Sequence, residues 1–219
     1  MQIELKHGAG GAATDALIGS LFAKYFQNEI LSRMEDGAVL PELAGSPVLT
    51  TDSFVVTPLF FPGGDIGRLA VCGTVNDLAC MGARPLYLTA AFILEEGLNL
   101  EVLEQVVQSM AATAREAGVQ IVAGDTKVVE RRHPDAAVVV TAKTGADAAA
   151  ATTAQAGADE GAAAMAKVGA DAVSAGTETA PGLFINTTGL GLRPVHCQIG
   201  ASQIRLGDKI LVSGTLGDH

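Results

Sequence analysis

The sequence predicts a globular domain of mixed helix and strand structure, either α/β or α+β. Stretches with the β-branched and apolar character of strands alternate with amphipathic stretches typical of helices. In addition, 48% of the 219 residues are hydrophobic, which is enough for a sizeable core. The predicted strands are Pro47–Thr57, Leu86–Leu94, Val119–Ala123 and Leu183–Thr188, with Asp208–Val212 as a weaker fifth.

The clearest helix is predicted over Leu100–Ala117. Asn99 can cap its N-terminus, acidic residues in the first turn favour the helix dipole, and Gly118 ends it. Its apolar stripe consists of Leu103, Val106, Val107, Met110 and Ala114. This spacing is that of a helix that packs one face against a core.

A second helix is predicted to begin after Asp65 and to end near Gly82. At 100° per residue, Asp77 falls on the same face as the apolar or small residues Ile66, Ala70, Gly73 and Met81. A buried charge without a partner is costly, so such groups pair, bind a metal or stay protonated. We therefore expect this helix to form the wall of a site.

The segment 131–181 is rich in alanine and, between Arg131 and Ala180, has no Leu, Ile, Phe, Tyr or Trp. Such a segment cannot build a core of its own. We interpret it as a flexible or partly helical insertion in a surface loop. A bundle of short helices packed through alanine is the alternative, although alanine faces bury little area.

Composition excludes several classes of function. The formal net charge is −10 and the chain has no Lys/Arg cluster, which argues against a nucleic-acid partner. No apolar stretch approaches the roughly 18 residues of a membrane span, and the first residues contain no apolar signal region, so we expect a cytoplasmic protein. Cys72, Cys80 and Cys197 are odd in number and lack CxxC spacing, which argues against disulfides and zinc.

Four aspartates lie in or next to predicted turns and strand ends. Asp52 closes the strand VLTTD, Asp125 closes VQIVAGD, Asp77 lies on the helix, and Asp36 lies in the segment MEDGAVLP. Carboxylates at the edge of a sheet are common in ligand sites. Mg²⁺ takes oxygen ligands and completes its octahedron with water and substrate phosphates, so these four residues are the predicted metal ligands.

Two further features suggest a nucleotide. Lys127 supplies a cation for a phosphate oxygen. The segment HGAGG, from His7 to Gly11, offers backbone donors without a Cβ in the way. Each signal has a plainer explanation: an aspartate as a turn or cap, Lys127 and Asn76 as solvated side chains, the glycines as a flexible terminus.

In order along the chain, the motifs HGAGG, DGAVLP, TTDSFVVTPLFFPGGDIG, NDLACMGARP, GDTKVV and LFINTTGLG resemble the HypE family. These hydrogenase maturation factors are carbamoyl dehydratases of the PurM-like ATP-binding superfamily. The resemblance covers residues 1–130 and 182–219. It implies an α+β fold, a mixed sheet backed by helices, in which two copies pair their sheets into a barrel across a homodimer.

The chain departs from the family pattern in three places. The alanine-rich segment replaces a short turn, and Gly37 stands where the family usually has alanine. The sequence also stops at His219, so we expect a fragment that lacks the family's C-terminal domain and terminal cysteine. The expected domains are therefore an ATP-binding domain over 1–130 and 182–206, an insertion over 131–181, and the start of a second domain over 207–219.

The resemblance implies that ATP phosphorylates a thiocarbamate oxygen on that cysteine and that loss of phosphate leaves a thiocyanate. Lys127 and Asp77 would be catalytic, and ATP and Mg²⁺ would be the cofactors. The residues expected to bind them are His7, Gly8, Gly10, Gly11, Asp36, Asp52, Asn76, Asp77, Asp125, Thr126 and Lys127.

The implied partners are a second copy, the carbamoyltransferase HypF and the HypC–HypD scaffold complex. Three alternatives stay open: a thiamine-monophosphate kinase, a selenophosphate synthetase, or a non-catalytic dimerisation module. FFPGGDIG argues against the two enzymes. HGAGG also lacks the reactive Cys or Sec that a selenophosphate synthetase would need.

Overall fold

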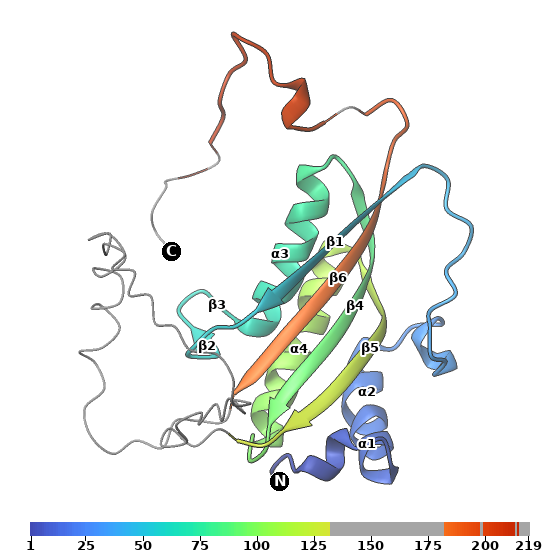
Figure 1. The fold of residues 1–219 in the computed structure, drawn as a ribbon, viewed down its shortest axis with the longest axis vertical. Coiled ribbons are helices and arrows are strands. Elements are labelled where there is room, and N and C mark those ends of the chain that lie inside the picture. Colours follow the sequence, from blue (N-terminus) through green and yellow to red (C-terminus); the bar gives the residue numbers. More distant parts are fainter. Residues whose placement is uncertain (132–181, 198, 213, 215–219) are drawn as a thin grey trace, which may run out of the picture. The chain divides into compact units, whose positions relative to one another are not determined.

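A four-stranded mixed sheet forms the centre of the computed structural model, which describes residues 1–131, 182–197, 199–212 and 214. The strand order is β1-β6-β4-β5 (Figure 1). β6 is antiparallel to both neighbours, whereas β4 and β5 are parallel. The strands are β1 (Ser46–Phe54), β4 (Arg84–Glu95), β5 (Gln120–Val129) and β6 (Leu183–Arg193). The predicted mixed sheet is confirmed, and β5 and β6 extend well beyond their predicted ends.

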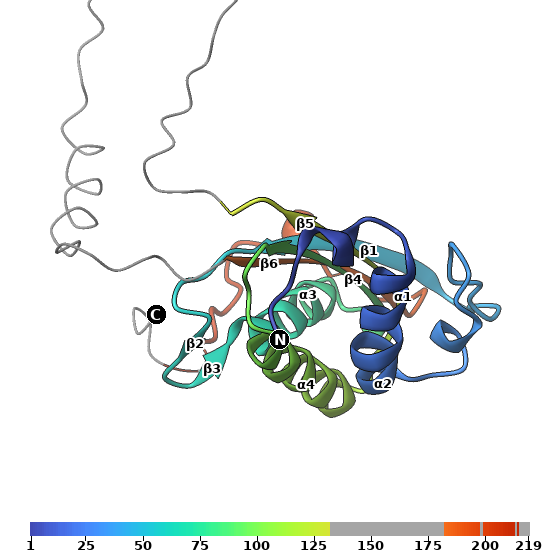
Figure 2. The same cartoon turned by 90° about the horizontal axis from the view of Figure 1, so that it is seen from below.

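Two long helices, α3 (Ile66–Cys80) and α4 (Leu100–Ala117), cover one face of the sheet (Figure 2). Asp65 caps α3 by accepting hydrogen bonds from the backbone N–H groups of Gly67 and Arg68. Asn99 caps α4 in the same way, and Gly118 ends it with a left-handed backbone. Both predicted helices are confirmed, and α4 has the predicted bounds.

The core lies between these helices and the sheet, because alternate side chains of each strand point toward the helices. Leu88, Phe92 and Leu94 of β4 are buried, and so are Leu183 and Ile185 of β6. From α4, the predicted stripe residues Leu103, Val106, Val107, Met110 and Ala114 are all buried. The opposite, outer face of the sheet carries no helix of the described residues.

The N-terminal segment adds a row of short helices that the sequence analysis did not anticipate. They are the 3₁₀ turn Leu5–Gly8, α1 (Ala12–Leu17), a π-helical turn Ile18–Phe22, α2 (Ala23–Phe26) and the 3₁₀ turn Leu31–Arg33. Phe22 packs on Phe92 with ring centroids 4.7 Å apart, which joins this row to β4. The row lies beside β5 (Figure 1).

The remaining described residues are mostly loops. β2 (Phe60–Phe61) and β3 (Gly64–Asp65) form a small hairpin before α3. The weak fifth strand is a wrong prediction, since 208–212 belong to no strand and are exposed. The alanine-rich segment, apart from Arg131, lies outside the described residues, so its interpretation and the domain boundaries stay predictions. Where the structure describes the chain, none of its helices combines the length and apolarity of a membrane span.

Candidate nucleotide site

A cavity of about 470 Å³ lies between the edge strand β5 and the N-terminal row of helices. Its polar side consists of glycines from the N-terminal segment together with the β5 residues 124–127. Its apolar side comes from the row of short helices and from β4. Of the predicted site residues, six line it: Gly8, Gly10, Asp36, Asp125, Thr126 and Lys127.

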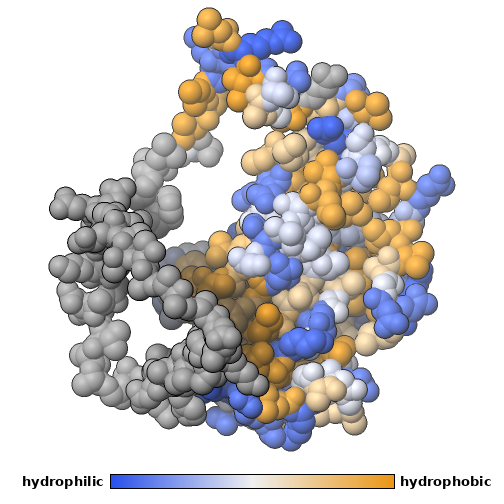
Figure 3. All heavy atoms as spheres, in the orientation of Figure 1, coloured by the Kyte–Doolittle hydropathy of each residue, from blue (hydrophilic) through white to orange (hydrophobic). Residues whose placement is uncertain are grey.

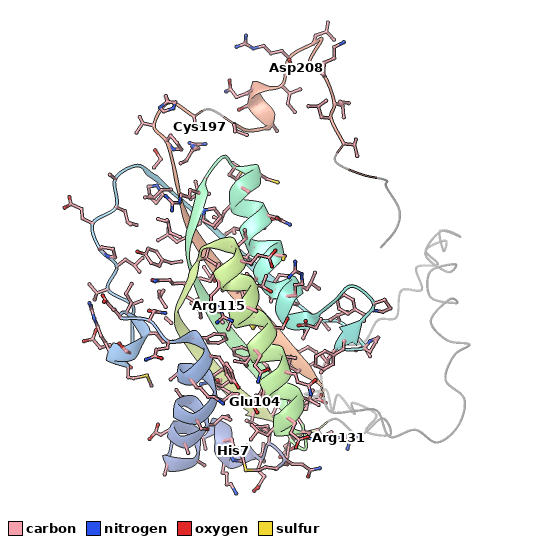
Figure 4. The ribbon with its side chains drawn as sticks, turned by 180° about the vertical axis from the view of Figure 1, so that it is seen from behind. His7, Glu104, Arg115, Arg131, Cys197 and Asp208 are labelled. Carbon is pink, nitrogen blue, oxygen red and sulfur yellow. The ribbon has the colours of Figure 1, made fainter. Side chains whose placement is uncertain are left out.

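The glycine-rich segment lies directly against β5. A Cβ on Gly8 would lie 2.4 Å from the backbone nitrogen of Val128, so only glycine permits this approach. Gly10 has a left-handed backbone (φ 78°), and its N–H donates to the hydroxyl of Thr14 at 3.0 Å. Two predicted residues of this segment lie outside the cavity lining. Gly11 caps α1, and the buried His7 accepts a hydrogen bond from the backbone N–H of Glu4 through Nδ1 (Figure 4).

The β5 side of the cavity carries two opposite charges. Lys127 Nζ lies 2.9 Å from Asp125 Oδ1, which also accepts the backbone N–H of Thr126 at 2.9 Å. Both charged side chains are more than half exposed. The hydrogen bond from Lys127 is the main reason that the pKa of Asp125 lies below its ordinary value, and it outweighs the burial that acts in the other direction. Asp125 is therefore an ionised, accessible carboxylate at the mouth of the cavity.

The apolar wall is held in place by partly buried hydrogen bonds of Asn28. Its residues include Phe22, Phe26 and Phe92. Asn28 donates from Nδ2 to the carbonyl of Ile121 on β5 at 2.8 Å, and its Oδ1 accepts the backbone N–H groups of Ile30 and Leu31. This side chain therefore supplies a hydrogen bond to one carbonyl group of β5. It also fixes the turn at Ile30 and Leu31, which leads to the acidic residues Glu35 and Asp36 at the rim of the cavity.

The acidic rim follows from an unusual backbone. Met34 has a left-handed conformation (φ 51°), which is uncommon for a residue other than glycine, and it directly precedes Glu35 and Asp36. All three residues line the cavity. Glu35 was not among the predicted site residues.

Asp52, Asn76 and Asp77 lie at the opposite edge of the sheet. Asp77 Oδ2 accepts a hydrogen bond from the hydroxyl of Thr50 on β1 at 3.0 Å. A Cβ built on Gly73 of α3 would lie 3.6 Å from Asp52 Oδ2, which places that carboxylate between β1 and α3. Asn76 and Asp77 are both exposed.

The expectation that Asp77 is a buried carboxylate is therefore wrong. Its helical phase does turn it toward the sheet, as the contact with Thr50 shows. The strand it faces is β1, the edge strand, and no further strand of the described residues lies beyond it to exclude water. Asp52 and Asp125 also differ from expectation, because both lie within their strands rather than at the ends.

The fold of this chain does not bring the four predicted metal ligands together. Asp52 pairs in register with Thr187, which pairs with Ala90, which pairs with Gly124. Three strand spacings of about 4.8 Å thus separate Asp52 from the row next to Asp125, roughly 14 Å in all. Among the described residues no group of three or more His, Cys, Asp or Glu side chains could hold a metal ion.

Most residues of the cavity wall are not among the predicted site residues. The spacing of Leu17, Leu21 and Phe22, all buried, is that of an amphipathic helix and could have indicated the N-terminal row. Gly124 had no comparable signal: a Cβ there would lie 2.5 Å from the carbonyl oxygen of Ala90. Only the pairing of β4 with β5 shows this close approach.

Several curated proteins are similar in sequence to this chain. The chain is 43% identical over 217 residues to "Carbamoyl dehydratase HypE" of Bradyrhizobium diazoefficiens, covering 99% of this chain and 49% of that protein. The corresponding protein of Escherichia coli strain K12 is 43% identical over 222 residues, with 99% and 52% covered. The chain thus spans about half the length of the curated relatives it matches.

A crystal structure of hydrogenase maturation protein HypE in complex with ATP is also similar. Its TM-score is 0.63 at 43% sequence identity, and the likeness covers 87% of this chain and 43% of that one. The family description "AIR synthase related protein, N-terminal domain" matches residues 34–146, which is more than half of the chain. The chain therefore belongs to the family of AIR synthase related proteins, through their N-terminal domain.

Proposed function

We propose that this chain forms the nucleotide-binding part of an ATP-dependent carbamoyl dehydratase of hydrogenase maturation, and that ATP binds in the cavity beside β5. The observation that carries the proposal is that one cavity brings together the glycine-rich segment and the side chains of Asp125 and Lys127. A curated carbamoyl dehydratase is 43% identical to the chain, and a similar HypE structure contains ATP.

The cavity suits a nucleotide in size and in the distribution of its polar groups. A volume of about 470 Å³ falls within the range of small-molecule sites, and one wall is apolar enough to bury a base. Gly8 and Gly10 allow backbone donors to approach phosphates closely, while Lys127 offers a charged donor to a phosphate oxygen. The glycine-rich segment would act as a cover for the phosphates.

The donor set fits a magnesium ion that arrives with the nucleotide. Mg²⁺ keeps several waters and is bound through one or two carboxylates plus substrate phosphates. Asp125 and Asp36 both line the cavity and supply that number. When bound there, the ion would neutralise charge on the phosphates. Asp52 and Asp77 would contribute only where a second protomer brings its β1 edge to the cavity, and we assign them that role.

In the proposed reaction the oxygen of a cysteine S-carboxamide, on a part of the protein outside this chain, attacks the γ-phosphorus of ATP. ADP leaves as the O–P bond forms, and the amide nitrogen loses one proton to solvent. The second proton leaves to solvent as the C–O bond breaks, so phosphate departs with the former carbonyl oxygen and an S-bound nitrile remains. Lys127 would hold the transferring phosphoryl group, and Asp77 would act from the neighbouring protomer. Positioning and charge neutralisation supply most of the catalysis in such transfers.

The outer face of the sheet supports a homodimer as the working assembly. Leu49 is 70% exposed and Ile93 is 46% exposed on this face, where apolar side chains gather over the strands (Figure 3). Asp125 and Lys127 pair in register with Ala91 and Ile93, so they share this face. A dimer through the sheets would therefore lie next to the cavity. HypF and the HypC–HypD complex are the further partners that we propose.

Calorimetry with Mg²⁺ and a non-hydrolysable ATP analogue tests the nucleotide site. Lys127→Met should weaken binding about ten- to hundredfold, the loss expected for one charge-assisted hydrogen bond. Lys6→Met is the matched control, because Lys6 pairs with Glu4 at the same 2.9 Å and lies outside the cavity lining. Asp77→Asn should weaken binding if the β1 edge takes part.

Absence of binding to the unsubstituted chain would sink the enzyme proposal and favour a non-catalytic dimerisation module. The chemistry needs a separate measurement, thiocyanate formation on the full-length protein with its carbamoyltransferase. ATP cleavage without dehydration of the carbamoylated cysteine would contradict the proposed reaction and favour another PurM-like enzyme, a thiamine-monophosphate kinase or a selenophosphate synthetase.

A further inference from the structure

The ion pair at the cavity mouth joins two residues of the same strand. Asp125 and Lys127 are two positions apart on β5, so their side chains lie on the same side of the strand. Asp125 Oδ1 has both the Lys127 ammonium and the Thr126 N–H within 2.9 Å. The carboxylate that would meet an incoming cation therefore already has a cationic partner from its own strand.

This pair is well placed to exchange partners. The two side chains are 62% and 61% exposed, and exposed ion pairs contribute little to stability because water screens them. An ammonium group and a divalent cation on the same carboxylate repel each other, and Mg²⁺ tolerates little distortion of its octahedron. Lys127 has a flexible stem and can turn to a phosphate oxygen when one is within reach.

We propose that Lys127 is an internal counter-ion of Asp125 that opposes binding of a bare metal ion and favours binding of a metal–triphosphate complex. This rests on the proposed function, because the second partner of Lys127 is a phosphate oxygen. Without nucleotide, Lys127 occupies the carboxylate and repels the ion. With nucleotide, Lys127 moves to the phosphates, and Asp125 becomes available to the metal. The residue thus makes the site selective for the complex over the free ion.

The test uses Mn²⁺ as a paramagnetic probe of the Mg²⁺ site, with electron paramagnetic resonance reporting free ion. In the absence of nucleotide, Lys127→Met should bind Mn²⁺ about three- to tenfold more tightly than the unsubstituted chain, because a nearby positive charge is removed. With the non-hydrolysable ATP analogue, the same substitution should weaken binding of the complex. Opposite signs in the two measurements are what the proposal requires.

Lys6→Met removes an equal charge from a closely matched pair, 2.9 Å and 59% and 53% exposed, and should change neither measurement. In an Asp125→Asn background, Lys127→Met should no longer tighten Mn²⁺ binding. Unchanged or weaker Mn²⁺ binding in Lys127→Met overturns the proposal, and so does an equal gain in Lys6→Met. Because the Mn²⁺ measurement needs no nucleotide, it can fail or succeed independently of ATP binding.

Discussion

At the scale of single residues, the surroundings of each aspartate decide what it can do. Asp65 caps α3 and accepts a hydrogen bond from the hydroxyl of Ser109. Asp77 accepts from Thr50 at an open sheet edge, and Asp52 lies against Gly73. Asp125 alone among these four has a lysine partner at the mouth of a cavity. The same residue type thus serves as cap, edge carboxylate and candidate ligand.

The pKa of Asp125 gives a prediction at this scale. Since Lys127 is the main cause of its low pKa, Lys127→Met should raise that pKa toward the ordinary value. A lowered folded-state pKa means that the group stabilises the fold above its unfolded-state pKa and loses that contribution as pH falls through the folded value. In Lys127→Met most of this acid-side dependence should disappear.

A ¹³C NMR titration of the side-chain carboxyls measures this directly. Glu4, whose pKa is lowered chiefly by its hydrogen bond to Lys6, is the internal reference and should titrate unchanged in Lys127→Met. Lys6→Met should show the reverse pattern, with Glu4 shifted and Asp125 unchanged. An Asp125 titration that is the same with and without Lys127 would contradict the assigned cause.

The candidate site residues could be identified from the sequence, but which of them lie close together in the fold could not. Helical phase correctly turned Asp77 toward the sheet, but phase contains no information on which strand lies opposite. Burial at that position depends on β1 being an edge strand, and its neighbour β6 comes from more than 130 residues later in the chain. For the same reason Asp36, Asp52, Asp77 and Asp125 were predicted to form one metal site. In the structure Asp36 and Asp125 line the cavity, whereas Asp52 and Asp77 lie near β1.

At the scale of elements, α3 and α4 cross at a glycine. A Cβ on Gly67 would lie 2.4 Å from the carbonyl oxygen of Val106 and 2.9 Å from Met110 Cγ. Backbone oxygen cannot move away as a side chain can, so the helices would have to separate. Their close packing also keeps both against the sheet that supports β5.

Gly67→Ala should therefore destabilise the protein by about 1–3 kcal/mol, the usual cost of overpacking, although alanine is the better helix former. Gly19→Ala is the matched control, because Gly19 is also helical and a Cβ there meets nothing within 4 Å. That variant should be neutral or up to about 1 kcal/mol more stable. Urea unfolding measures the free energy of unfolding of both variants. Equal stability of the two would contradict the close packing of α3 against α4 at Gly67.

Elements with strong local signals were the predictable ones. α4 has a cap, an apolar stripe and a terminal glycine, and its predicted bounds hold. The N-terminal row contains a helical stretch over 12–26 that is interrupted by a π-helical turn, flanked by 3₁₀ turns. Its position depends on long-range contacts such as Asn28 with Ile121 and Tyr25 with Glu104 of α4. Because these partners are about 80 or more residues away, local patterns could not place the row that forms the cavity.

At the scale of the whole molecule, the two faces of the sheet differ. One is covered by α3 and α4, and the other presents exposed apolar side chains on β1, β4 and β5, among them Leu49, Ile93 and Val129. Within the described residues nothing helical covers that second face. Exposed apolar side chains of this kind favour association with a partner of complementary shape.

Ile93 lies on an inner strand of this face and is the sharpest probe of the proposed homodimer. In a sheet-to-sheet dimer, Ile93→Arg would place a charge without a partner in the interface, and we expect dissociation to become easier by about a hundredfold or more. Leu69→Arg is the control: Leu69 is 40% exposed, close to the 46% of Ile93, but it lies on α3. Analytical ultracentrifugation over a concentration series should show Ile93→Arg shifted to monomer and Leu69→Arg unchanged.

If the proposal that Asp77 acts across the dimer is also correct, Ile93→Arg should abolish the effect of Asp77→Asn on nucleotide binding, because each cavity then lacks the second β1 edge. A dimer that persists in Ile93→Arg would move the interface elsewhere and leave Asp52 and Asp77 without a route to the nucleotide.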